Sequence, residues 1–143
     1  METFSHAMEI AIDAPMETVW RLLITKPSEW WLGYEGAPMQ MAIEPWPGGR
    51  LYRDLGDDNG HFWATVQVIK RPYLIEFAGP MFMSGAVLAH LSFRLEEAGE
   101  GSTKLTMSHA AIGTIPESYR EGADRGWANI MKGLKDYVGS HTD

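Results

Sequence analysis

The chain has 143 residues, of which 45% are hydrophobic and 22% charged, a balance typical of one globular domain with a real core. Its formal net charge of -7 argues against nucleic acid and anionic membrane surfaces as partners, because both need clustered Lys and Arg. The absence of cysteine excludes disulfides, thiolate catalysis and cysteine-based zinc sites.

The sequence contains no apolar run of membrane-spanning length, and its first residues lack the basic and apolar blocks of a signal peptide. We therefore expect a cytoplasmic protein without membrane insertion.

The first part of the chain predicts one strand followed by two short helices. Apolar and polar residues alternate over 6–13, which is typical of a strand with one buried face. Asp13-Ala14-Pro15 then marks a helix start, and apolar residues follow at helical spacing over 16–23. After Lys26-Pro27-Ser28, a second helical piece is expected over 29–32.

Strand and turn patterns fill the middle of the chain. Turns rich in Gly, Pro, Asp and Asn separate six segments with strand-like composition or alternation. These expected strands cover 39–44, 50–55, 61–69, 73–78, 87–96 and 103–111. Because they follow one another with hairpin-length links, they predict an antiparallel meander.

A long helix with a broad apolar stripe is predicted over 116–138. Gly122, Gly126 and Gly133 lie together on one flank of that stripe, and each costs a helix roughly 1 kcal/mol relative to Ala. Two interpretations stay open. Either a strand or a ligand approaches the helix closely at these glycines, or the helix is kinked and properly starts near Trp127.

Short signatures of a known superfamily run in order along nearly the whole chain. They are Ile10-Ala11-Ile12-Asp13-Ala14-Pro15 with Val19-Trp20, Trp30-Trp31, Pro47-Gly48-Gly49-Arg50, Val66-Gln67-Val68-Ile69 with Pro72-Tyr73-Leu74, Thr103-Lys104-Leu105-Thr106-Met107-Ser108-His109, and Gly126-Trp127 with Leu134-Lys135-Asp136-Tyr137. In this order they resemble the START-like, or SRPBCC, superfamily. The similarity is greatest to the branch named after the C-terminal domain of the activator of the heat-shock chaperone's ATPase.

The resemblance implies an α+β helix-grip fold in a single domain over 1–143. In that fold a curved antiparallel sheet wraps on the long C-terminal helix, and an internal cavity lies between them. Members of the superfamily bind lipids, hormones or polyketides, and some catalyse cyclisation or dehydration. The namesake's chaperone activity depends on a further N-terminal domain, for which we expect no room in this chain, so that activity is not carried over.

Side chains that face inward by strand and helix periodicity are the expected ligand-binding residues. They are Trp30, Trp31, Met39, Met41, Ile43, Leu51, Arg53, Phe62, Val66, Phe77, Met81, Met83, Leu91, Phe93, Met107, His109, Trp127 and Met131. Within this set, His109 is a candidate acid, base or orienting hydrogen-bond partner, and Arg53 a candidate anchor for a carboxylate or carbonyl. Each also has a structural interpretation: a histidine held by an internal hydrogen bond, and an arginine whose stem packs while its head reaches water.

Metal or cofactor binding finds no support in the spacing of candidate ligands. His61, His90 and His109 fall on separate expected strands, with His90 facing outward, and 57–60 is typical of a turn rather than a calcium loop. The sequence also lacks a nucleophile elbow and a phosphate-binding glycine loop. We expect neither a metal nor a cofactor.

Three hypotheses for function follow from these patterns. The leading one is binding of a small, largely apolar molecule. The second is a small cyclase, dehydratase or hydrolase, which requires His109 and Arg53 to meet in one cavity. The third is a protein-interaction module, co-chaperone-like, that uses the loop Met81-Phe82-Met83 or a sheet edge and is favoured if the interior is fully packed. That loop is expected to be either a lid over the cavity or a homodimer contact.

Overall fold

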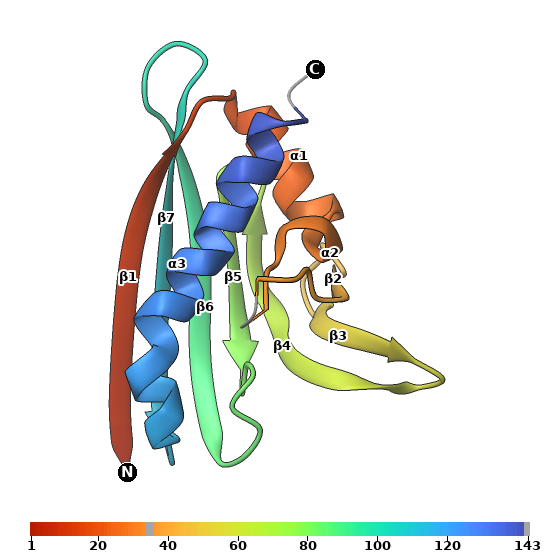
Figure 1. Ribbon diagram of the computed structural model, residues 1–143, viewed down its shortest axis with the longest axis vertical. Helices are drawn as coiled ribbons and strands as arrows, with labels where there is room; N and C mark the ends of the chain where they lie inside the picture. Colours follow the sequence, from red (N-terminus) through yellow and green to blue (C-terminus); the bar gives the residue numbers. More distant parts are fainter. Residues whose placement is uncertain (34–35, 142–143) are drawn as a thin grey trace.

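A single antiparallel sheet with a long helix across one of its faces organises the chain (Figure 1). This computed structural model describes residues 1–33 and 36–141. Its elements in chain order are β1 (Glu2–Ile12), α1 (Met16–Thr25), α2 (Pro27–Trp30), β2 (Met41–Ile43), β3 (Arg50–Gly56), β4 (Asn59–Lys70), β5 (Leu74–Gly79), β6 (Val87–Glu97), β7 (Thr103–Gly113) and α3 (Glu117–Gly139). The predicted α+β class and helix-grip order are confirmed.

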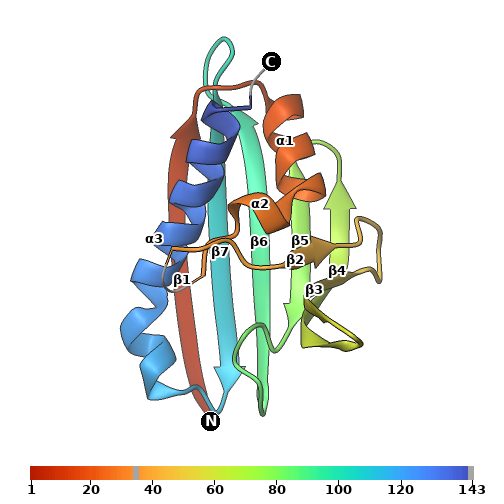
Figure 2. The same ribbon diagram turned by 45° about the vertical axis from the view of Figure 1, so that its right-hand side comes forward.

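The sheet joins the first and last strands of the chain. Its seven strands lie in the order β1-β7-β6-β5-β4-β3-β2, so β2 to β7 form an antiparallel meander and β1 adds beside β7. The β1–β7 pairing runs from Glu2 opposite Gly113 to Ile12 opposite Thr103. Figure 2 shows α3, α1 and α2 together on one side of the sheet, where α3 contacts β1. Residues far apart in sequence therefore meet beneath α3.

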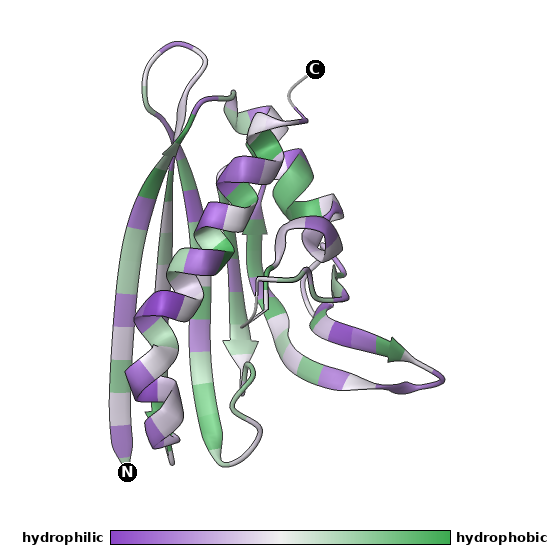
Figure 3. Cartoon of the chain, in the orientation of Figure 1, coloured by the Kyte–Doolittle hydropathy of each residue, from purple (hydrophilic) through white to green (hydrophobic). Residues whose placement is uncertain are grey.

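Alternation along the strands gives the sheet one apolar face. In β7, Leu105 and Met107 are fully buried, and Phe93 of β6 lies directly opposite Met107. Figure 3 shows the same alternation along β1. Because successive side chains of a strand point to opposite faces, one strand face supplies the core and the other faces away from α3.

A β-bulge in β4 overturns one expectation about this face. Leu51 pairs with Ala64 and Tyr52 with Phe62, which leaves Trp63 as an extra residue in β4. Trp63 and Ala64 are consequently both buried, and the alternation reverses before them. Phe62, expected to face inward with Val66, is 45% exposed, so that expected position is wrong.

The glycines of α3 divide into two kinds. The helix is continuous from Glu117 to Gly139, so the interpretation in which it starts near Trp127 is wrong. A Cβ at Gly133 would lie 2.4 Å from the Trp30 carbonyl oxygen, because the segment after α2 crosses α3 there. A Cβ at Gly122 or Gly126 would meet no atom of residues 1–33 and 36–141 within 4 Å. No helix in the described ranges is long and apolar enough to cross a membrane.

We expect alanine substitutions at two of these glycines to have opposite effects on stability. Gly133→Ala places a methyl group against backbone and should lower the free energy of unfolding by about 2 kcal/mol. Gly126→Ala enters open space in a helix and should raise it by about 1 kcal/mol. Urea unfolding followed by circular dichroism measures both. Equal effects of the two substitutions would contradict the close approach at Gly133.

Candidate functional site

A cavity of about 410 Å³ lies beside the first half of α3, where the segment after α2 and the β5–β6 loop approach that helix. Its size falls within the range of small-molecule sites. Its lining residues are Trp31, Leu32, Gly33, Met39, Trp63, Phe82, Met83, Pro116, Ser118, Tyr119, Gly122, Ala123, Arg125, Gly126, Trp127, Asn129 and Ile130. The hollow therefore lies at the flank of the helix and not deep between helix and sheet.

Helix α3 presents two adjacent stripes to this cavity. Because residues three and four positions apart share a helix face, each stripe is continuous. The apolar stripe comprises Tyr119, Ala123, Trp127 and Ile130. The second stripe comprises Ser118, Gly122, Arg125, Gly126 and Asn129. The open space at Gly122 and Gly126 is thus part of the cavity.

Five aromatic residues lie in the apolar part of the wall, and we refer to them as the aromatic cluster: Trp31, Trp63, Phe82, Tyr119 and Trp127. Trp31 meets Trp63 edge-on at 5.6 Å and Trp127 at 6.1 Å between ring centroids. Phe82 lies 4.8 Å from Tyr119 and 5.1 Å from Trp63. Trp31 and Trp127 are almost fully buried, so the protein holds these rings in place by packing.

The β5–β6 loop contributes to the wall through Phe82 and Met83. Met81 and Met83 on either side of it are buried in the core, and the Met81 N–H donates to the Trp63 carbonyl at 2.8 Å. Phe82 is 36% exposed and packs against Trp63 and Tyr119, the neighbouring members of the aromatic cluster. Of the three large apolar side chains expected to form a lid or a dimer contact, two are therefore anchors of the loop.

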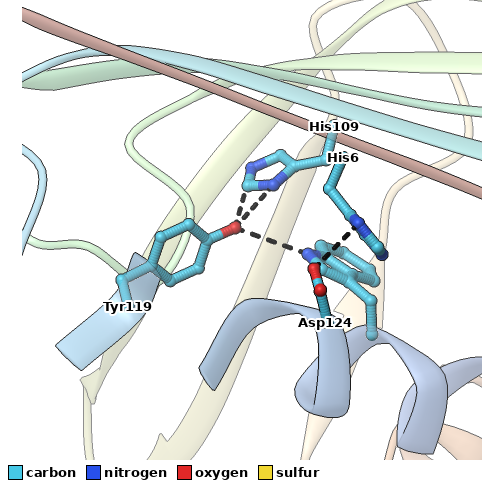
Figure 4. Close-up of polar contacts among 5 residues, drawn as sticks. His6, His109, Tyr119 and Asp124 are labelled. Carbon is cyan, nitrogen blue, oxygen red and sulfur yellow. Dashed lines mark hydrogen bonds and ion pairs between the residues drawn. The ribbon is translucent and has the colours of Figure 1, made fainter. Parts of the chain in front are cut away.

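Behind the cavity wall, Tyr119 forms a buried hydrogen bond with His109 (Figure 4). The Tyr119 Oη lies 2.5 Å from His109 Nδ1, and the Trp127 Nε1–H donates to the same oxygen at 3.4 Å. Burial lowers the pKa of His109 to about 4, with smaller contributions from the charges of His6 and His90. Burial also raises the pKa of Tyr119 to about 12. Both groups are therefore neutral at pH 7, and the hydrogen bond joins two uncharged side chains.

Beside this pair, His6 of β1 contacts the surface of α3. It lies directly opposite His109 in the β1–β7 pairing, and its Nδ1 is 3.0 Å from Asp124 Oδ1 (Figure 4). Neither His6 nor His109 lines the cavity. The arrangement is that of a satisfied buried histidine, which is the structural interpretation of His109.

Arg53 lies in a different part of the sheet. It is opposite Met41 of β2 and His61 of β4, and three strands separate β3 from β7. Its Nε is buried and has no hydrogen-bond partner in the described residues. Arg53 is absent from the cavity wall, so the structure does not bring it together with His109.

The other expected binding residues divide between the cavity and the packed core. Those that line the cavity are Trp31, Met39, Met83 and Trp127. Those buried in the core are Trp30, Met41, Leu51, Val66, Phe77, Met81, Leu91, Phe93, Met107 and Met131. Ile43 is partly buried against that core. Periodicity identified inward-facing positions, but it could not tell which of them other side chains cover.

Several cavity residues were not anticipated as binding residues. Tyr119, Arg125, Asn129 and Trp63 belong to this group. The sequence feature that could have pointed to this part of α3 is the pair Gly122 and Gly126, because glycines destabilise a helix and two on one flank indicate a requirement beyond helix formation. Within residues 1–33 and 36–141, no three His, Cys, Asp or Glu side chains are placed to hold a metal ion.

The buried neutral state of His109 predicts a specific pH dependence. Because its pKa is about 4 in the folded chain and 6.5 ordinarily, its contribution to stability is complete above pH 6.5 and is lost as the pH falls towards 4. At about 1.4 kcal/mol per pKa unit, the loss is about 3 kcal/mol. The stability difference between the wild type and His109→Gln, measured by urea unfolding at pH 7 and pH 4, should shrink by this amount. A constant difference would show that His109 is not held neutral by burial.

Comparisons with known proteins agree with the fold. The family model described as Activator of Hsp90 ATPase homolog 1-like protein matches residues 13–139. None of the curated proteins matches the chain.

Solved structures with the same architecture are distant in sequence. Protein MLL2253 from Mesorhizobium loti has a TM-score of 0.74 at 21% identity, covering 98% of this chain and 99% of its own. The conserved protein of unknown function EF2215 from Enterococcus faecalis has a TM-score of 0.72 at 19% identity, covering 95% and 71%. The Aha1 dimer from Colwellia psychrerythraea, solved in solution, has a TM-score of 0.67 at 21% identity, covering 96% of each chain. These likenesses show the fold.

Proposed function

This chain belongs to the Activator of Hsp90 ATPase homolog 1-like family within the START-like superfamily, and from that premise we propose that it binds a small, largely apolar molecule in the cavity beside α3. The observation that carries the proposal is the cavity of about 410 Å³ walled by the aromatic cluster. An apolar guest placed there gains roughly 25 cal/mol for each Å² of surface removed from water, in addition to aromatic contacts.

The two open glycine positions of α3 support the same proposal. Gly122 and Gly126 each destabilise the helix by roughly 1 kcal/mol relative to Ala, although no neighbouring atom among the described residues requires their small size. A side chain at either position would occupy the cavity, since both residues line it. The sequence therefore keeps free volume at the expense of helix stability, which is the expected compromise at a binding site.

The enzymatic alternative has less support. Its two candidate residues, His109 and Arg53, lie in separate regions, and the pKa of His109 is far below neutrality. A general acid or base is most effective when its pKa lies near the working pH. A fully packed interior would have favoured the interaction-module alternative, and the cavity beside α3 argues against that condition.

Binding can be tested with the neutral fluorescent probe N-phenyl-1-naphthylamine, whose emission rises in apolar sites. We expect saturable binding to the wild type and at least about tenfold weaker binding to Gly126→Leu, because the added side chain fills part of the cavity. Gly139→Leu is the matched control, since Gly139 lies on the same helix, also faces open space and is outside the cavity. Absence of saturable binding, or equal binding by both variants, would refute the proposal.

We also propose that the protein is a cytoplasmic homodimer. The cysteine-free composition suits a reducing compartment, and one solved structure of the same fold is described as a dimer. On the face of the sheet opposite α3, Leu88 of β6 and Ile112 of β7 lie directly across from each other and are 60% and 43% exposed. Such a paired apolar surface is suited to a self-complementary contact between two copies.

Size-exclusion chromatography with light scattering tests the dimer. The wild type should show twice the chain mass, and Leu88→Lys should weaken dimerisation at least about tenfold, because it places a charge in an apolar contact. Leu55→Lys is the control, since Leu55 is similarly exposed but lies on β3, away from the Leu88–Ile112 pair. A monomeric wild type, or a Leu88→Lys variant that remains dimeric, would contradict this proposal.

A further inference from the structure

The cavity wall is chemically divided, and the division indicates what kind of guest fits. One side is the aromatic cluster, and the other is the stripe of α3 that carries Ser118, Arg125 and Asn129 around the two open glycines. Because Gly122 and Gly126 lack side chains, a guest can lie against the helix between these polar groups and the rings. A guest that used the whole wall would have an apolar body and a polar end.

Arg125 is the charged side chain among the described residues of that wall. The carboxylates nearest to it along α3 are Glu121 and Asp124, and neither lines the cavity. Asp124 is paired with His6 at 3.0 Å. Among residues 1–33 and 36–141 none of the ion pairs involves Arg125, so within that part of the chain no carboxylate is paired with its guanidinium.

The other polar groups of the wall also include hydrogen-bond donors. The Asn129 carboxamide lies one helical turn beyond Arg125 on the same stripe. The Trp31 indole N–H is buried and has no hydrogen-bond partner in the described ranges. A buried donor without a partner costs free energy that an acceptor on a guest would recover. A carboxylate only accepts hydrogen bonds, so it complements a wall with a cation and several donors.

Resting on the binding function proposed above, we infer that the guest is a small organic acid, with an aromatic or compact acyl body against the aromatic cluster and its anionic group at Arg125. The arginine supplies charge and a planar pair of N–H donors at the rim, where the anionic group keeps part of its hydration. The protein's net charge of -7 gives no general attraction for anions, so selectivity for an acid must come from this local cation.

Two dyes that share one fluorophore test the inference. N-phenyl-1-naphthylamine is neutral, and 1-anilinonaphthalene-8-sulfonate is the same ring system with a sulfonate that stands in for the carboxylate. Arg125→Gln should weaken binding of the sulfonate dye about fivefold and leave the neutral dye within about twofold, since one exposed charge contact is lost. Arg125→Lys should retain most of the affinity for the sulfonate dye.

Matched controls separate a local contact from a general charge effect. Arg94→Gln makes the same change in net charge on the opposite face of the sheet, where Arg94 is exposed, and should alter neither dye. Gly126→Leu should weaken both dyes, which places them in the cavity and not on an exposed apolar surface.

The outcomes distinguish the two proposals. If the neutral dye binds and Gly126→Leu weakens it, but Arg125→Gln leaves the ratio of the two dissociation constants unchanged, the organic-acid inference is wrong and the binding function stands. The inference is also wrong if Arg94→Gln changes that ratio as much as Arg125→Gln. If the wild type binds neither dye, the binding function falls and the inference falls with it.

Discussion

The packing of Trp127 against both the core and the cavity is the contact on which the rest of the site depends. In the interior, the Trp127 ring packs against His109 and Trp31, with ring centroids 5.4 Å and 6.1 Å apart. The same side chain lines the cavity and donates a hydrogen bond to Tyr119. Because a ring in a close-packed interior has few alternative positions, α3 cannot shift without changing the core and the cavity wall together.

Glycines in helix α3 allow close packing in one part of the helix and leave open space in another. At Gly133 the missing side chain allows the backbone at the end of α2 to approach. This part of α3 therefore packs directly against the segment around Trp30 and Leu32. At Gly122 and Gly126 the missing side chains leave space that no atom of the described part of the chain occupies within 4 Å. Tight packing at one end thus holds the helix in place, while the other end retains a hollow with fixed walls. A preformed hollow of this kind lowers the ordering cost of binding.

The polar groups near the cavity have two separate purposes. Tyr119 and His109 satisfy each other where water is excluded, and burial keeps both neutral at pH 7. Arg125 is exposed, lines the cavity and forms no ion pair within residues 1–33 and 36–141. The buried pair therefore contributes to stability and ring orientation, whereas the rim arginine is able to contact a guest. A candidate functional residue is better recognised by an unmet interaction than by burial alone.

The sequence by itself determined the α+β class, the order of elements and the inward face of most strands, because these depend on local periodicity and turn residues. It also indicated that the glycines of α3 meet a requirement other than helix formation, because each of them destabilises a helix. Only the tertiary structure decided that Phe77 and Met107 are covered, that Phe62 faces outward beyond the β4 bulge, and that Tyr119 and Arg125 border the hollow. Periodicity fixes the direction of a side chain relative to its own strand or helix. Whether that side chain packs or borders a cavity depends on contacts with residues distant in sequence, which no local pattern contains.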